Sequence, residues 1–170
     1  GHVFEIGNDW VQRRLHCLSG RLSTTSLTHG QSGEEYLEEA VSEFGLTLAG
    51  EGRRVTLESR DFSLESFSCD SDGQRAALEL RLVANVEGVP LAVTLFYEAR
   101  SDENCLRKWL RVEQCDLPGW VIRQVVLENL RLREMVEGVA PRQRYPKMWG
   151  NHEDDVNFEP HAVDLSDPDQ

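Results

Sequence analysis

The sequence has little positive charge and no long apolar run. It contains 18 lysines and arginines against 30 aspartates and glutamates, which gives a formal net charge of -12. Nucleic-acid binding requires clustered basic residues that replace the counterions of the phosphates, so this composition argues against a nucleic-acid partner and favours neutral or cationic ones. No stretch of about 18 consecutive apolar residues occurs, so no membrane-spanning helix is predicted.

Common signatures of catalysis and cofactor binding are also missing. The sequence has no G-x-S-x-G elbow, no P-loop and no dinucleotide-binding fingerprint. A glycosidase would need two carboxylates across a cleft. No spacing distinguishes a pair among the carboxylates in or beside the predicted strands, which are Glu43, Asp61, Glu98, Glu113 and Glu128. We therefore assign no catalytic residue, no cofactor and no metal ligand.

The four cysteines include no C-x-x-C pair, which argues against a zinc ribbon or a dithiol redox motif. Cys105 and Cys115 lie at opposite ends of one predicted strand, roughly 33 Å apart, which is too far for a disulfide between them. Each could pair with Cys17 or Cys69 on another strand. The simpler interpretation is four half-buried free thiols, since free cysteine often behaves as a small core residue.

Alternation of apolar and polar residues is the dominant pattern. It predicts strands over residues 9–16, 21–27, 43–48, 55–57, 61–68, 78–86, 91–98, 105–115 and 120–133. Strands of this length, joined by short polar turns in 170 residues, indicate one all-β domain, an antiparallel β-sandwich with few or no helices. Only residues 34–42 fit a helical face, and an irregular approach to the next strand is the favoured interpretation of this segment.

The chain changes character after Val139. Four prolines interrupt residues 140–170, and acidic residues accumulate there. We predict a β-sandwich domain over residues 1–139 and an acidic, proline-containing linker or arm over residues 140–170 that leads toward a missing domain. Tyr145 and Trp149 are candidate contacts with that domain. His152 with Glu153–Asp155 could hold Ca²⁺ or Zn²⁺, but a solvated acidic loop is the favoured interpretation.

The predicted strand 105–115 carries the main candidate binding residues. One face holds Leu106, Lys108, Leu110 and Val112, and the other holds Arg107, Trp109, Arg111 and Glu113. The Trp109 ring could stack on a pyranose face while Arg107 and Arg111 donate to sugar hydroxyls. The favoured alternative is a structural one, in which Trp109 is turned toward the opposite sheet or toward a missing catalytic domain, with the arginine stems packed beside it.

Several short motifs occur in a consistent order from Phe4 to Leu132: Ile6-Gly7-Asn8-Asp9 followed by Val11, Gly20 to Leu27, Glu43-Phe44, Ser59-Arg60-Asp61-Phe62, Leu95-Phe96-Tyr97-Glu98, and Leu106 to Val112. Together they resemble the N-terminal β-sandwich domain of melibiase-type (clan D) α-galactosidases. The resemblance implies a supersandwich of the galactose-mutarotase type, set before a (β/α)8 barrel that carries the two catalytic aspartates. No substrate-contacting residue of that family is carried over to this sequence.

The resemblance leads to three functional hypotheses. The first is a non-catalytic accessory domain of a bacterial glycoside hydrolase, cytoplasmic or extracytoplasmic, which supports the barrel and oligomer contacts and possesses a possible carbohydrate site. The second is a free-standing carbohydrate-binding or protein-interaction module. The third is a mutarotase-type sugar isomerase, which would need acid and base groups converging in one cleft. The histidines lie mainly in turns and the tail, which counts against the third hypothesis.

Overall fold

The computed structural model describes residues 1–50, 52–115 and 118–133, without the side chains of residues 114 and 115. The elements in chain order are β1 (His2–Gly7), β2 (Val11–Leu18), β3 (Arg21–His29), β4 (Val41–Ser42), β5 (Gly45–Gly50), β6 (Arg53–Glu58), the single-turn 3-10 helix η1 (Ser59–Asp61), β7 (Ser63–Ser71), β8 (Arg75–Val86), β9 (Val89–Arg100), β10 (Leu106–Cys115) and β11 (Trp120–Val126).

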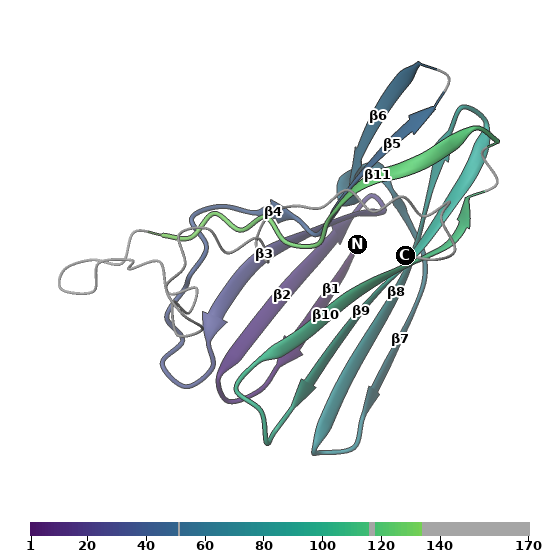
Figure 1. Cartoon of the computed structure of the whole chain (residues 1–170). Helices are drawn as coiled ribbons and strands as arrows, with labels where there is room; N and C mark the ends of the chain where they lie inside the picture. Colours follow the sequence, from purple (N-terminus) through teal and green to yellow (C-terminus); the bar gives the residue numbers. More distant parts are fainter. Residues whose placement is uncertain (51, 116–117, 134–170) are drawn as a thin grey trace, which may run out of the picture.

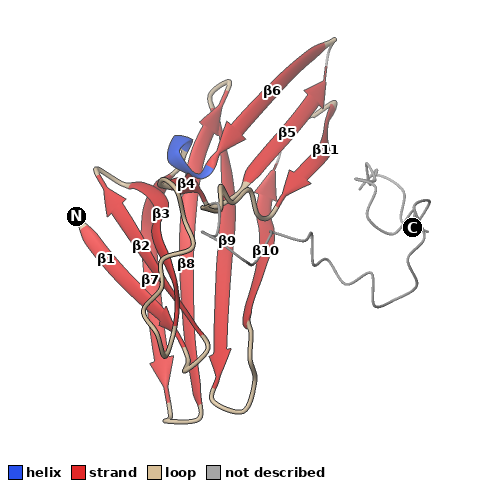
Figure 2. Ribbon diagram, turned by 90° about the vertical axis from the view of Figure 1, so that its left-hand side faces the viewer, coloured by secondary structure: helices blue, strands red, loops and turns tan. Residues whose placement is uncertain are grey.

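The strands form three antiparallel sheets. Two four-stranded sheets have the orders β1-β2-β3-β4 and β10-β9-β8-β7, and a three-stranded sheet has the order β11-β5-β6. Figure 1 shows the two four-stranded sheets as two layers, with the three-stranded sheet extending from one end. The view in Figure 2, a quarter turn away, shows the same end-on extension of β5, β6 and β11. The prediction of an all-β, antiparallel sandwich is confirmed.

Alternation along the long strands builds the core. On β8 the alternate residues Leu78, Leu80, Leu82, Ala84 and Val86 are all buried. They belong to one hydrophobic cluster with alternate residues of β9 and with side chains from both other sheets, among them Phe4, Leu15, Leu22, Leu46 and Leu48. Burying a leucine or phenylalanine side chain contributes about 1.5–3 kcal/mol, so this shared cluster is what joins the three sheets.

Residues 34–42 are not helical, which confirms the irregular approach to the next strand and shows that the helical alternative is wrong. The carboxylate of Glu35 accepts hydrogen bonds from the backbone N–H groups of Leu27 (2.9 Å) and Leu37 (3.0 Å) and from the Ser26 hydroxyl (2.6 Å). Such local bonds from a side chain compete with the helical hydrogen-bond pattern. The segment is therefore an irregular connection that Glu35 attaches to β3.

The strand predicted over 120–133 is shorter than expected. β11 ends at Val126, and its register with β5 shifts between Ile122 and Gln124. Farther along, the backbone leaves β5 and bonds elsewhere: Glu38 N–H donates to Arg131 C=O, and Arg133 N–H donates to Tyr36 C=O, both at 2.9 Å. Residues 127–133 thus form a strap that runs from the three-stranded sheet toward β3 and β4, visible as the green trace in Figure 1.

Candidate functional site

The structure places Trp109, Arg107 and Arg111 on the outer face of the β7–β10 sheet. Trp109 lies opposite Phe96 in the β10–β9 register, and its side chain is 42% exposed. The inward positions of β10 belong to Leu106, Lys108, Leu110 and Val112. The expectation that Trp109 faces the opposite sheet is therefore wrong, because the apolar side chains take the inner face and strand geometry sends the ring outward.

Trp109 and Phe96 form a stacked pair across the two strands. Their ring centroids are 5.2 Å apart and their planes differ by 7°. The Arg111 guanidinium lies over the Phe96 ring, 5.0 Å from its centroid. Such aromatic and cation–π contacts contribute on the order of 0.5–1.5 kcal/mol each. The contacts hold Trp109 at a defined position while a large part of its surface stays open to solvent.

The arginines beside Trp109 are paired with carboxylates. Arg107 pairs with Glu103 and lies 3.6 Å from Glu98, and Arg111 pairs with Glu113 at 3.0 Å. Neither guanidinium is therefore a fully free donor for a sugar hydroxyl. Each still has more N–H groups than its carboxylate partners use, because a guanidinium carries five.

Glu113 is the centre of the polar network on this face. Its carboxylate accepts hydrogen bonds from the Thr94 hydroxyl at 2.5 Å, from Arg81 at 2.8 Å and from Arg111 at 3.0 Å. These three bonds, in that order of importance, lower the pKa of Glu113 to about 2. Glu113 therefore stays ionised at all ordinary pH values, and its carboxylate orients the side chains of Arg81 and Arg111.

A shallow groove of about 290 Å³ adjoins the stacked pair. Its polar and aromatic lining includes Ser68, Asp70, Arg75, Glu79, Phe96 and Trp109. The Phe96–Trp109 pair, this groove and the flanking ion pairs are called the aromatic face below.

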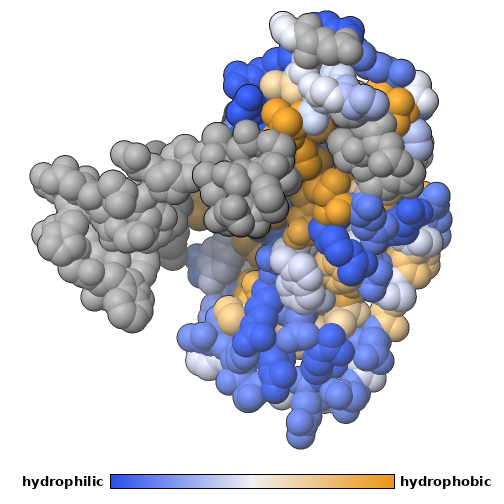
Figure 3. Space-filling view, turned by 45° about the vertical axis from the view of Figure 1, so that its right-hand side comes forward, coloured by the Kyte–Doolittle hydropathy of each residue, from blue (hydrophilic) through white to orange (hydrophobic). Residues whose placement is uncertain are grey.

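In the space-filling view of Figure 3, hydrophilic residues dominate the part of the surface over the four-stranded sheets, and hydrophobic ones gather nearer the three-stranded sheet.

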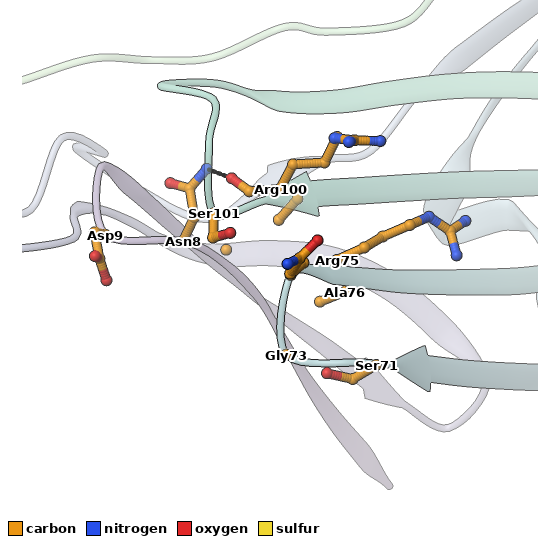
Figure 4. A pocket seen from close by; sticks show the side chains of 11 residues that line it. Asn8, Asp9, Ser71, Gly73, Arg75, Ala76, Arg100 and Ser101 are labelled. Atoms are coloured by element: carbon orange, nitrogen blue, oxygen red, sulfur yellow. Dashed lines mark hydrogen bonds between the residues drawn. The ribbon is translucent and has the colours of Figure 1, made fainter.

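A second cavity, of about 220 Å³, lies at the end of the sandwich between the β1–β2 turn, the β7–β8 turn and the end of β9. Figure 4 shows Asn8 reaching from the β1–β2 turn toward the backbone of Arg100. Its amide donates to the carbonyls of Arg100 (3.0 Å), Glu103 (2.9 Å) and Cys105 (3.1 Å), while its Oδ1 accepts from the backbone N–H groups of Trp10 and Val11. Asn8 therefore acts as a clamp between the two sheets, and its polar atoms are used within the fold.

Replacing Asn8 by alanine should lower the free energy of unfolding by about 2–3 kcal/mol, because the substitution leaves several backbone groups without their partner. Urea denaturation followed by circular dichroism measures the change. The neighbouring Asp9 has an exposed side chain, so Asp9→Ala is the matched control and should change stability by less than about 0.5 kcal/mol. Equal effects of the two substitutions would contradict the clamp role.

Between the two four-stranded sheets lies a group of charged side chains, which we call the interlayer cluster. It consists of Arg13 on β2, Glu43 before β5, Lys108 on β10 and Glu128 in the strap. The hydroxyls of Thr24 and Tyr97 complete it, because both donate to the Glu43 carboxylate. Except for Glu128, all these side chains are buried or nearly so.

Each cation of the interlayer cluster contacts both carboxylates. Arg13 binds Glu128 through two N–H groups, at 2.6 and 2.8 Å, and lies 3.4 Å from Glu43. The Lys108 Nζ lies 3.1 Å from the Glu43 carboxylate, 2.5 Å from the Glu43 carbonyl oxygen and 3.4 Å from Glu128. Because the two positive and two negative charges balance, the cluster is neutral as a whole, which makes its burial tolerable.

Burial shifts the pKa values in the cluster. Desolvation lowers the pKa of Lys108, although the negative charge of Glu43 opposes this shift. Desolvation also raises the pKa of Tyr97 well above its usual value, and here the charge of Glu43 acts in the same direction. Desolvation alone would raise the pKa of Glu128, but the hydrogen bond and charge of Arg13 outweigh it and lower that pKa. The Glu128 carboxylate is therefore held in its ionised form by Arg13.

Sequence reasoning did not find the interlayer cluster. Glu43 and Glu128 were two of five candidate carboxylates, and the structure brings these two together, but with two cations between them. The available signal was a charged residue at an inward position: Lys108 shares its face with Leu106 and Leu110, and Arg13 lies on the inward face of β2 with Leu15. A charge on an apolar face is buried only when another chain segment supplies its partner.

The remaining predicted groups have different outcomes. Cys17, Cys69 and Cys105 are free thiols, which agrees with the simpler interpretation for these three, although only Cys17 is buried. Tyr145, Trp149 and the His152–Asp155 group lie outside the described residues. In the described ranges, no three His, Cys, Asp or Glu side chains gather as a metal site would require. No helix in these ranges is long and apolar enough to cross a membrane.

We compared the chain with known protein families, curated proteins and solved structures. None of the three comparisons finds a match. The resemblance to α-galactosidase N-terminal domains therefore stays a prediction, and the case for a function depends on the site geometry.

Proposed function

We propose that this chain is a non-catalytic carbohydrate-binding β-sandwich domain and that the aromatic face is its sugar site. The observation that carries the proposal is the 42% exposed Trp109 ring, held in a stacked pair with Phe96 on an otherwise polar sheet face. Large aromatic side chains are usually buried, so an exposed and positioned ring on such a face suits a ligand with a flat apolar surface.

The surroundings of Trp109 supply what a sugar needs besides a ring face. A pyranose has one apolar face and a rim of hydroxyl groups that donate and accept hydrogen bonds. On the aromatic face, the spare N–H groups of Arg107 and Arg111 would donate, and the carboxylates of Glu79 and Asp70 along the groove would accept. Since the chain carries a net charge of -12, we expect neutral sugars to bind in preference to anionic ones at this open site.

We further propose that the domain is accessory to a glycoside hydrolase of the α-galactosidase type. The order of motifs from Phe4 to Leu132 supports this, as does the antiparallel sandwich. The catalytic barrel would then be a separate domain of the parent protein. The β-sandwich domain would support that barrel and contribute contacts between the subunits of an oligomer. The gene sequence downstream of the Gln170 codon tests it: a (β/α)8 barrel with two aspartates supports the proposal, and its absence contradicts it.

Trp109→Ala should weaken carbohydrate binding by roughly tenfold or more, equivalent to about 1.4 kcal/mol, because the stacking surface is lost. A glycan array first identifies a bound neutral sugar, and isothermal titration calorimetry then measures its dissociation constant for each variant. Trp109 is exposed and its removal leaves the inward face of β10 unchanged, so the variant should remain folded.

Trp10→Ala is the matched control, since Trp10 is 47% exposed but lies in the β1–β2 turn rather than on the aromatic face. Its substitution should leave sugar affinity unchanged. A wild-type chain that binds no glycan, or a Trp109→Ala variant with wild-type affinity, would overturn the sugar site. A mutarotation rate on galactose or glucose above that of buffer would instead support an isomerase.

A further inference from the structure

We propose that Arg13 and Lys108 form a binding site for small carboxylate ligands, which the strap residue Glu128 occupies in this structure. The proposal is independent of the aromatic face, which lies on the other side of the β7–β10 sheet. The proposed ligand of the interlayer cluster is a small carboxylate from solution, and Glu128 of the same chain competes with that ligand for Arg13 and Lys108.

The geometry around Glu128 is that of a bound carboxylate ligand. Arg13 donates to both Glu128 oxygens, at 2.8 Å from one guanidinium nitrogen and 2.6 Å from the other. This two-pronged geometry is the strongest that a guanidinium and a carboxylate make. Lys108 approaches the same two oxygens at 3.4 and 3.5 Å. Two cations from different sheets thus converge on one carboxylate group.

The rest of the cluster keeps the two cations in place without Glu128. Arg13 Nε donates to the Thr24 hydroxyl at 2.7 Å, and Lys108 Nζ donates to the Glu43 carbonyl at 2.5 Å. Glu43 is fully buried and fixed by the hydroxyls of Thr24 and Tyr97. The site is therefore built from buried side chains that hold one another.

The charge balance makes the site depend on an anion. With Glu128 in place, two cations face two carboxylates. If Glu128 withdraws, Arg13 and Lys108 face Glu43 alone, and one positive charge stays uncompensated in a mostly buried position. An unpaired buried charge is strongly unfavourable, so a carboxylate from solution would stabilise this state. The overall charge of -12 opposes its approach only at long range, where salt screens it.

Glu128 is the member of the cluster that can leave most easily. Its side chain is 37% exposed, whereas those of Arg13 and Lys108 are 4% and 7% exposed. It belongs to residues 127–130, which lie in no strand and follow the end of β11. The backbone bonds that attach the strap to residues 36–38 come only later, at Arg131 and Arg133.

The experiment replaces Glu128 by alanine and offers formate, the smallest carboxylate, in its place. Thermal unfolding is recorded in sodium formate and in sodium chloride at equal ionic strength. At a formate concentration ten times its dissociation constant, we expect Tm to rise by about 3–6 °C over the chloride value, and the rise to saturate. The wild-type chain should respond much less, because Glu128 already fills the site.

Glu87→Ala is the matched control. The Glu87 side chain is also 37% exposed and pairs with Arg53 at 2.5 Å, but it lies in the turn after β8. Its variant should show no formate-specific gain. If Glu128→Ala is unfolded in chloride, formate should restore its β-sheet circular dichroism. The proposal is overturned if formate and chloride act alike, if Glu87→Ala gains as much, or if the unfolded variant stays unfolded in formate.

Discussion

Replacing Glu43 by alanine should lower the free energy of unfolding by about 3–5 kcal/mol, one of the largest effects expected in this chain. Glu43 is fully buried, and its carboxylate pairs with Lys108 and Arg13 while it accepts the hydroxyl groups of Thr24 and Tyr97. Its removal leaves two cations with only Glu128, and two buried hydroxyls without their acceptor. Removing one partner of a buried ion pair costs far more than the pair itself contributes.

Urea denaturation with linear extrapolation measures the loss. Glu5→Ala is the control: Glu5 also pairs with an arginine, Arg14, at 2.6 Å, but both side chains are exposed. Exposed pairs contribute at most about 1 kcal/mol, so this control should lie close to the wild type. If the two variants lose similar amounts of stability, the interlayer cluster is not the buried network that its geometry indicates.

Phe62→Ala should also lower stability by about 3–5 kcal/mol. Phe62 is the residue after η1, and η1 contacts both β3 and β6. The Phe62 side chain is only 1% exposed. Its ring meets Phe44 edge-on, with centroids 5.1 Å apart, in the core cluster that includes side chains from all three sheets. Truncation leaves a cavity where these sheets meet, and the neighbours cannot collapse into it without moving a whole sheet.

Phe67→Ala tests whether this effect comes from position rather than from loss of a ring. Phe67 lies on β7, five residues farther along, and is 48% exposed, with its ring against Phe4 and His2. We expect a loss of less than about 1.5 kcal/mol, since a half-exposed ring buries less apolar surface. A larger loss for Phe67→Ala than for Phe62→Ala would contradict the assignment of the core.

Much of the core was predictable because strand alternation is a local property. Every second residue from Leu78 to Val86 on β8 is apolar, and these alternate positions are buried; Phe44, Leu46 and Leu48 follow the same pattern and are buried too. The same local rule put Trp109 and Leu110 on opposite faces of β10. It could not say which of two faces is covered, because that depends on the sheet packed against it.

The errors have a common physical cause. The helical interpretation of residues 34–42 fails because Glu35 attaches that segment to β3, and the strand predicted over 120–133 ends early because Arg131 and Arg133 pair with residues 36 and 38. In the first case a side chain bonds to the preceding strand, and in the second the backbone pairs with a segment far away in the sequence, so in both a specific contact outweighs the periodic pattern. Local propensity is a weak preference compared with such tertiary contacts.

The sequence by itself determined an all-β, antiparallel fold and which residues of each long strand share a face, since these depend on composition and on neighbours two residues apart. Only the tertiary structure decided that Trp109 is exposed and stacked on Phe96, and that Arg13 meets Glu128, which is 115 residues away. A buried charge needs a partner, but spacing along the chain does not tell which distant residue provides it.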